Sequence, residues 1–311
     1  MRTSVLIHPD ELSESWIRRA AGHGYTGIAL HPVGGNKAAD ALADLLERLE
    51  SPAYRGLIDR VADAGLTVEY ELHAAGYLFP RDGFSLHPER YRMNGDGVRT
   101  ADYNLCCSDR EALEEIAHRA RILAGKLYRT APYLYFWADD ARDCFCHCPD
   151  CRPWSASDQN LLLMNAMLNE VRKDFPDMRL ACLAYADTME VPQNVRPAEG
   201  IFLEYAPFDR DMHRFLREQT EKQAGNVRAL LDFFGKKDAK VLDYWMDNSY
   251  FSNWTKPPKY YEPDFAVVAD DLEWYRSLGF EAVSSFACYL GDDYTERYGE
   301  PVLPRLDGKR L

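Results

Sequence analysis

Short apolar runs and longer amphipathic stretches alternate along the whole chain. The apolar runs are rich in β-branched and aromatic residues, which favour buried strands. Eight such runs cover residues 4–9, 25–32, 66–79, 133–140, 179–188, 200–207, 240–248 and 281–291. Stretches with helical periodicity cover residues 12–21, 38–64, 109–127, 157–174, 221–234 and 264–278. Ser108 and Ser157 stand where the N-caps of two of these helices are expected.

This alternation predicts parallel strands joined by helices. Eight strand–helix units in a chain of 311 residues are typical of a (β/α)8 barrel of the TIM type, which usually takes about 250 residues. We expect one domain over residues 1–311, and a doubly wound open sheet is the alternative fold. The link at 186–200 is rich in Pro and Asn, and only a short segment follows the last run. We therefore expect an irregular fifth unit and an irregular C-terminal closure.

Composition narrows the classes of function. Lys and Arg total 37 against 50 for Asp and Glu, and the net charge of −13 argues against binding to nucleic-acid phosphates. The first apolar run is too short for a signal peptide, and no run is long enough to span a bilayer. We expect a cytoplasmic protein that binds neither nucleic acid nor membranes. A partner subunit covering the C-terminal closure would make the protein a homo-oligomer.

Residues 133–151, YLYFWADDARDCFCHCPDC, combine an aromatic run, two adjacent carboxylates and a cluster of cysteines. Cys146, Cys148 and Cys151 follow the spacing C-x-C-x-x-C, which lets several sulfurs converge on one ion and calls for a fourth ligand. In a reducing compartment this spacing favours metal ligation over disulfides. Reduced free thiols packed in a loop are the alternative.

In barrels of this type the catalytic residues lie at the C-terminal ends of the strands. The predicted strand ends carry carboxylates mixed with histidines, Trp and Tyr, a combination typical of sugar sites, where aromatic faces stack on pyranose rings. The candidate carboxylates are Asp139, Asp140, Glu204 and Asp247, and the candidate substrate contacts are His31, His73, Trp137, Tyr185, Tyr205, Tyr244 and Trp245. Side chains alternate along a strand, so at most one of the two adjacent aspartates need face a pocket. The two tryptophans are as well explained as barrel core.

Several motifs resemble a bacterial family known only as domain of unknown function 4838, which is placed among the glycoside-hydrolase-like barrels. The motifs are NLCCSDRE at 104–111, WADD followed by CHCPDC, SDQNLLLMNAM at 157–167, LAYADT at 183–188, and a loop with Arg210 and His213. This resemblance implies a barrel fold and a carbohydrate substrate, and it adds Arg210 to the candidate substrate contacts.

The cysteine pattern is similar to that of glycoside hydrolase family forty-two, whose β-galactosidases bind zinc through one cysteine after the third strand and C-x-C-x-x-C after the fourth. The similarity implies that Cys106, Cys146, Cys148 and Cys151 bind zinc. It also puts Asp139 and Asp140 in the place of that family's acid/base glutamate. Family-twenty hexosaminidases are similar there too, with an Asp-Glu pair ending the fourth strand.

The leading hypothesis is a glycoside hydrolase with Asp140 as general acid, because a carboxyl group beside a like charge and an aromatic wall is favoured in its neutral form. Asp139 would orient the sugar, and Glu204, or else Asp247, would be the opposing carboxylate. A zinc ion held by four thiolates has no open position, so zinc would be a structural cofactor. The alternatives are a carbohydrate-binding barrel without catalysis and a zinc hydrolase whose metal activates water.

Overall fold

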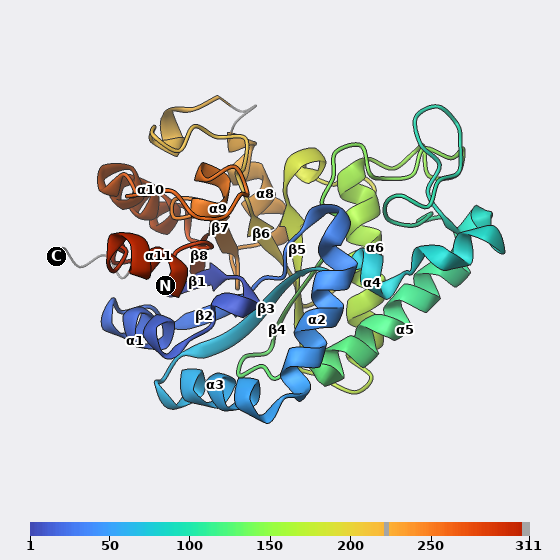
Figure 1. Ribbon diagram of the computed structural model, residues 1–311. Helices are drawn as coiled ribbons and strands as arrows, with labels where there is room; N and C mark the ends of the chain where they lie inside the picture. Colours follow the sequence, from blue (N-terminus) through green and yellow to red (C-terminus); the bar gives the residue numbers. More distant parts are fainter. Residues whose placement is uncertain (221–223, 307–311) are drawn as a thin grey trace.

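The chain folds into a closed barrel of eight parallel strands in the order β1 to β8, with helices outside it (Figure 1). This computed structural model describes residues 1–220 and 224–306. The strands are β1 (Arg2–Ile7), β2 (Gly27–Leu30), β3 (Thr67–His73), β4 (Tyr133–Trp137), β5 (Arg179–Ala184), β6 (Ile201–Tyr205), β7 (Lys240–Asp243) and β8 (Ala282–Phe286). Each strand overlaps one predicted apolar run, and all except β1, which begins at Arg2, lie within it. The predicted (β/α)8 barrel is therefore confirmed, and the open sheet is excluded.

The sheet closes between its first and last strands. β1 pairs with β8 through five residue partners, from Arg2 opposite Ala282 to Leu6 opposite Phe286. After β8 the described residues form one helix, the short α11 (Asp292–Tyr298). Between β5 and β6, a link that the structure describes throughout, the chain forms only a 3₁₀ turn at Ala186–Thr188. The irregular fifth unit and the short C-terminal segment are thus as expected, but neither prevents the barrel from closing.

The long helices pack around the barrel wall (Figure 1). In chain order the helices before α11 are α1 (Glu14–Gly22), α2 (Ala38–Glu50), α3 (Pro52–Asp63), α4 (Ala75–Leu78), α5 (Arg110–Lys126), α6 (Ala156–Val171), α8 (Val227–Phe234), α9 (Asn248–Phe251) and α10 (Phe265–Leu278). None of the described helices is long and apolar enough to cross a lipid bilayer.

Three details of the predicted helices need correction. The stretch 38–64 forms two helices, because Ser51 is extended and Pro52 cannot continue α2. The N-cap of α5 is Asp109 and that of α6 is Ser155, so the predictions of Ser108 and Ser157 were wrong by one and two residues. Ser155 caps α6 better because its hydroxyl and the carboxylate at the third helical position bond reciprocally. Of the predicted helix at 221–234, residues 221–223 lie outside the described residues.

The inside of the barrel holds a buried group of charges. The ammonium of Lys240 forms ion pairs with Glu69 (3.5 Å), Glu204 (3.4 Å) and Glu71. Burial alone would favour the neutral amine, but the three carboxylates outweigh it and raise the pKa of Lys240. Burial also raises the pKa values of Glu71 and Glu204.

Candidate active site and metal centre

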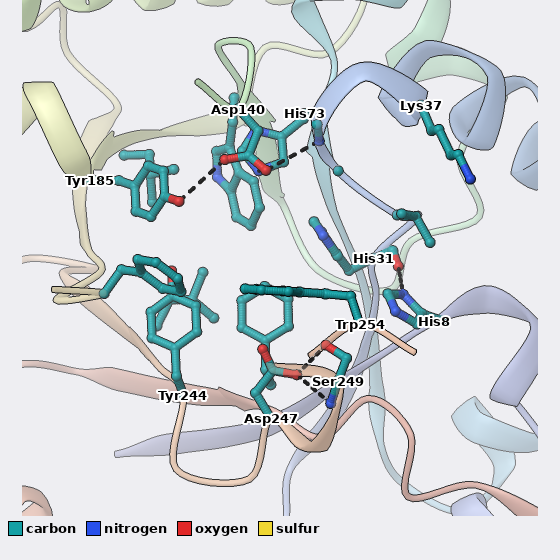
Figure 2. Close-up of a pocket in the computed structure, with 18 of the residues that line it drawn as sticks. His8, His31, Lys37, His73, Asp140, Tyr185, Tyr244, Asp247, Ser249 and Trp254 are labelled. Atoms are coloured by element: carbon teal, nitrogen blue, oxygen red, sulfur yellow. Dashed lines mark hydrogen bonds and ion pairs between the residues drawn. The ribbon is translucent and has the colours of Figure 1, made fainter. Parts of the chain in front are cut away.

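A cavity of about 510 Å³ opens at the C-terminal end of the barrel (Figure 2). Every strand contributes to its wall, through the strand's last residue or the loop that follows it. These residues are His8 after β1, His31 after β2, His73 of β3, Asp140 after β4, Tyr185 after β5, Phe208 after β6, Tyr244 and Asp247 after β7, and Tyr289 after β8. Seven of the twelve residues predicted from the sequence as catalytic or substrate-binding line this cavity: His31, His73, Trp137, Asp140, Tyr185, Tyr244 and Asp247.

Asp140 is held on one side of the cavity by groups from two neighbouring loops. The hydroxyl of Tyr185 donates a hydrogen bond to Oδ1 (3.2 Å), and the backbone N–H of Gly35 donates to Oδ2 (3.2 Å). Nε2 of His73 lies 4.0 Å from Oδ2. A Cβ atom on Gly34 would lie only 2.8 Å from Oδ2. The loop after β2 can therefore approach this carboxylate only because Gly34 has no side chain.

Asp247 lies on the opposite side of the cavity from Asp140 (Figure 2). It is the N-cap of α9, and its Oδ1 accepts hydrogen bonds from the hydroxyl (2.5 Å) and N–H (3.1 Å) of Ser249 and from the N–H of Tyr250 (3.3 Å). The residue is only 5% exposed. Burial raises the pKa of Asp247, and the hydrogen bonds from Ser249 and Tyr250 oppose this shift without cancelling it.

Three histidine rings line the cavity beside the carboxylates. Nδ1 of His8 bonds to the carbonyl of His31 (2.8 Å), Nδ1 of His31 to that of Glu71 (2.8 Å), and Nδ1 of His73 to that of Ala138 (2.9 Å). A carbonyl oxygen can only accept, so each Nδ1 carries the hydrogen and donates it, and Nε2 remains for a ligand. Burial, with the two neighbouring histidines, holds the pKa of His31 well below its usual value. This ring is neutral at physiological pH.

Glu204, the first choice for the opposing carboxylate, lies below the cavity and does not form its wall. It is fully buried, and one of its oxygens accepts a hydrogen bond of 2.7 Å from the indole N–H of Trp137. The other oxygen faces Lys240. The side chain points into the barrel, toward Lys240 at the start of β7, and does not line the cavity. Glu204 therefore supports the cavity through Trp137 and is not in contact with its space.

Tyr205, Trp245 and Arg210, predicted as substrate contacts, also lie outside the cavity wall. The hydroxyl of Tyr205 donates to the carbonyl of Ala224, and the indole N–H of Trp245 donates to Asp271 (3.0 Å). Arg210 is buried in an ion pair of 2.6 Å with the same Asp271. Tyr205 follows Glu204, so it faces the opposite side of the sheet, toward the helices. All three side chains belong to the core outside the barrel and do not line the cavity.

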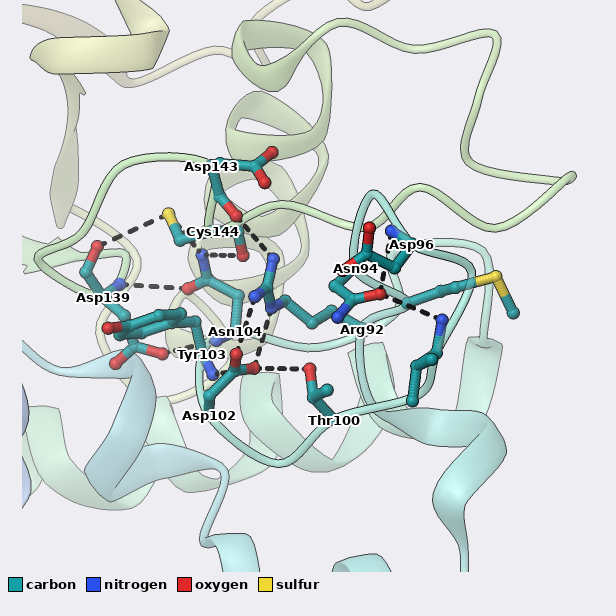
Figure 3. A network of polar contacts seen from close by, with 12 residues as sticks. Arg92, Asn94, Asp96, Thr100, Asp102, Tyr103, Asn104, Asp139, Asp143 and Cys144 are labelled. Atoms are coloured by element: carbon teal, nitrogen blue, oxygen red, sulfur yellow. Dashed lines mark hydrogen bonds and ion pairs between the residues drawn. The ribbon is translucent and has the colours of Figure 1, made fainter.

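Asp139 does not line the cavity, and Figure 3 shows it beside Asn104. It forms an ion pair with Arg81 and accepts a hydrogen bond from the backbone N–H of Asn104, while its own N–H donates to the side chain of Asn104 (3.0 Å). The amide of Asn104 also donates to the carbonyl of Cys144 (3.0 Å). Asn104 thus ties the cysteine loop to Asp139. Only Asp140 of the pair lines the cavity. Both residues follow the end of β4 at Trp137, so the conformation of the loop, and not the alternation of a strand, sets their directions.

The thiols of Cys106, Cys146, Cys148 and Cys151 form one buried cluster that can hold a metal ion. Sγ of Cys106 lies 3.6 Å from that of Cys148 and 3.7 Å from those of Cys146 and Cys151. Sulfurs bound tetrahedrally at about 2.3 Å would be about 3.8 Å apart, whereas a disulfide needs about 2.05 Å. All four are free thiols. The donor set and its spacing therefore fit a tetrahedral metal site.

Neighbouring groups complement this cluster. The backbone N–H of Met93 donates to Sγ of Cys146 (3.3 Å), and the guanidinium of Arg99 lies 3.8 Å from the same sulfur. Donors of this kind stabilise the excess negative charge of a four-thiolate site. Cys107, whose thiol contacts the carbonyl of Gln159 (3.6 Å), is outside the cluster. In Figure 1 the segment between α4 and α5, which carries Cys106, lies beside the segment between β4 and α6, which carries the other three.

Several residues of the cavity wall were not predicted from the sequence. They are Val33, Gly34, Gly35, Asn36, Lys37, Leu183, Phe208, Leu242, Ser249, Trp254 and Phe286. The adjacent glycines after the second apolar run were a usable signal, because paired glycines mark a close backbone approach. Trp254 lies in a loop without periodic pattern, and nothing in the sequence placed it over the cavity.

No curated protein matches the sequence. Among solved structures, the β-galactosidase of the psychrophilic Marinomonas ef1 is similar at a TM-score of 0.50 and 13% identity, over 92% of this chain and 54% of that one. A GH42 β-galactosidase has a TM-score of 0.51 and 14% identity, over 92% and 50%. An endo-β-1,4-glucanase from Xanthomonas axonopodis pv. citri has a TM-score of 0.51 and 11% identity, over 100% and 96%.

These neighbours share the barrel fold with this chain, and they are glycoside hydrolases. The chain spans about half the length of the two β-galactosidases. At the level of sequence, the model of the family described as domain of unknown function DUF4838 matches residues 50–296. The chain belongs to this family.

Proposed function

We propose that the protein is a glycoside hydrolase in which Asp140 and Asp247 are the two catalytic carboxylates. The observation that carries this proposal is their placement: they face one another across one cavity that is walled by aromatic rings (Figure 2). Carboxylates on opposite sides of a sugar ring are the arrangement that hydrolysis of a glycosidic bond requires. Trp137, Tyr185 and Tyr244 supply the apolar faces on which a pyranose ring stacks.

Asp140 is the proton donor in this proposal. Its side chain is 31% exposed, so it lies nearer the opening, where a leaving group departs. Tyr185 and Gly35 orient its two oxygens. Asp247 is deeper and acts on the inner face of the sugar as nucleophile or as general base. Asp247 must be ionised for either role, so its raised pKa should move the acidic limb of the rate profile above the usual pKa of an aspartate, about 3.9.

The metal in the four-cysteine cluster is zinc in this proposal, and it is structural. A zinc ion with four thiolate ligands braces the loops that carry them but leaves no position for water. None of the four cysteines lines the cavity, which disfavours the alternative of a zinc hydrolase. The substrate is a carbohydrate. Asp139 takes no part at the sugar, because Arg81 and Asn104 occupy its carboxylate.

Replacement of Asp140 tests the proposal. A panel of aryl galactosides, N-acetylhexosaminides and glucuronides first identifies a substrate. Asp140→Asn should then lower the rate by about 10²–10⁴-fold, because the amide keeps the shape of the carboxyl group but cannot donate its proton to the leaving oxygen. Sugar affinity and the unfolding temperature should stay nearly unchanged.

Asp247→Asn should lower the rate in the same way, and Asp139→Asn is the matched comparison outside the cavity. An unaltered rate for Asp140→Asn would reassign the acid. Binding of sugars without turnover of any glycoside would instead establish a carbohydrate-binding barrel without catalysis.

A further inference from the structure

Trp254 is an unusually exposed aromatic residue on the wall of the cavity. It is 61% exposed, whereas Trp137 in the same cavity is 1% exposed. In Figure 2 its indole extends over the cavity from the loop that follows α9. Among the described contacts its ring meets one other ring edge-on, that of Tyr250, at 5.6 Å between centroids. A large apolar face left open to water inside a cavity marks a surface for a ligand.

The backbone around Trp254 is held in an unfavourable conformation. Asn253 and Trp254 have φ angles of 53° and 51°. Asn adopts this left-handed region readily, but a bulky residue such as Trp rarely does. The N–H of Trp254 donates to the carbonyl of Ser249 (2.7 Å), and the hydroxyl of Tyr289 donates to the carbonyl of Trp254 (3.4 Å). Strain of this kind, without compensation from burial of the ring, is a feature of ligand-binding loops.

Burial gives the order in which a ligand meets the residues of the cavity. Trp254 is the most exposed of four key groups, followed by the side chain of Asp140, and Asp247 and Trp137 are almost completely buried. A sugar that reaches Trp137 has therefore passed Asp140, and the unit attached to it must lie toward Trp254. The cavity of about 510 Å³ has room for more than one pyranose ring.

We propose that Trp254 forms an outer subsite that binds the leaving sugar, so that the substrate is a glycan of at least two linked sugar units. The inference rests on the proposed function and specifies its substrate class. The indole stacks on the outer ring, the inner ring contacts Trp137, and the glycosidic bond between them lies beside Asp140. Free monosaccharides and glycosides with small alkyl groups occupy the inner position alone.

The test compares ligands of different length on matched variants. Calorimetry on protein carrying Asp140→Asn, to prevent cleavage, measures the affinity for galactose, glucose and N-acetylglucosamine and for lactose, cellobiose and chitobiose. Adding Trp254→Ala should weaken binding of the preferred disaccharide by about 2- to 10-fold, the usual size of an aromatic stacking contribution, and leave the monosaccharide unchanged. Trp254→Phe should retain part of the effect. Tyr260→Ala, at 62% exposure and outside the cavity, is the control and should change neither affinity.

The outcomes separate this inference from the function on which it rests. Equal weakening of monosaccharide and disaccharide by Trp254→Ala, or no weakening of either, overturns the outer subsite while the sugar site stands. Absence of binding for all six sugars to the parent protein, together with no turnover of any glycoside in the panel, overturns the proposed function, and the subsite with it.

Discussion

Gly34 has no side chain, and this leaves room for the carboxylate of Asp140. A Cβ atom there would lie 2.8 Å from Oδ2 of Asp140 and 3.2 Å from the ring of His73. The φ angle of Gly34 is −80°, which alanine adopts without strain. Gly34→Ala should therefore displace the carboxylate and leave the fold intact. We expect a loss of about 10²-fold in glycosidase rate, the size associated with misplacement of a catalytic group by about 1 Å, with little change in unfolding temperature.

Gly56→Ala is the matched control for this substitution. Gly56 lies in α3, and a Cβ there would meet nothing within 4 Å. This variant should keep full activity. Full glycosidase activity of the Gly34→Ala variant would show that Asp140 does not need its present position.

Glu11 gives a prediction about stability and pH. Its carboxyl group is buried and accepts hydrogen bonds from the N–H groups of His8 (3.2 Å) and Tyr289 (2.7 Å). Burial raises its pKa to about 8 from 4.5. Between these values the folded protein holds a proton that the unfolded chain releases, so stability falls as pH rises through this window. The slope is about 1.4 kcal/mol of unfolding free energy per pH unit.

Glu11→Gln removes the titrating group, so urea unfolding from pH 5 to 8 should show a shallower decline for this variant than for the parent protein. The variant will be less stable at pH 5, because an amide cannot accept from both N–H groups. Asp10→Asn, at an exposed neighbour, should retain the parent's slope. Parallel curves for Glu11→Gln and the parent would contradict the prediction.

At the scale of elements, the four-cysteine cluster joins two long loops that the strands alone do not hold together. Cys106 comes from the loop before α5 and the other three cysteines from the loop after β4. Purified protein should contain about one zinc ion per chain by elemental analysis. Cys106→Ser should lose the metal and lower the unfolding temperature, because it removes one of the four ligands.

Cys107→Ser is the matched control, since this thiol is equally buried, adjacent in sequence and outside the cluster. It should retain the metal. Metal-free parent protein, or disulfides among the four cysteines, would contradict the zinc assignment. Asn104 makes the cluster relevant to the cavity, because it bonds both to the carbonyl of Cys144 and to Asp139, next to Asp140 (Figure 3).

At the scale of the whole molecule, the barrel could be predicted because its strands are short, apolar and separated by helical periodicity. The strand ends could also be located, which is why His31, Asp140, Tyr185 and Asp247 were found. The sequence did not predict, in the same way, how far below the cavity a strand side chain lies or which face of the sheet it points to. Glu204 points into the barrel toward Lys240 and does not line the cavity. Tyr205, the next residue, points outward to the helices, where its hydroxyl bonds to the carbonyl of Ala224. Whether a polar strand residue faces the cavity, the inside of the barrel or the helices depends on register, which the sequence pattern does not resolve.

The loops were the least predictable part of the molecule. Phe208, Lys37 and Trp254 all line the cavity from segments that have no repeating pattern. Their positions depend on hydrogen bonds such as the one from the N–H of Trp254 to Ser249, which only tertiary structure determines. Cys106, a member of the four-cysteine cluster, is a different case. It stands 40 residues before Cys146, so its membership of the cluster could be inferred only by resemblance to a known zinc site.

The three histidine rings have a consequence for how ligands enter. Each Nδ1–H is already bonded to a carbonyl of the neighbouring strand or the loop after it, so the barrel itself orients the rings before any ligand arrives. A ligand then loses little affinity to ordering these side chains. The structures of the empty and the occupied cavity should therefore be nearly superimposable in this region. The free protein is then a sound template for designing inhibitors whose hydroxyl groups donate to Nε2 of these histidines.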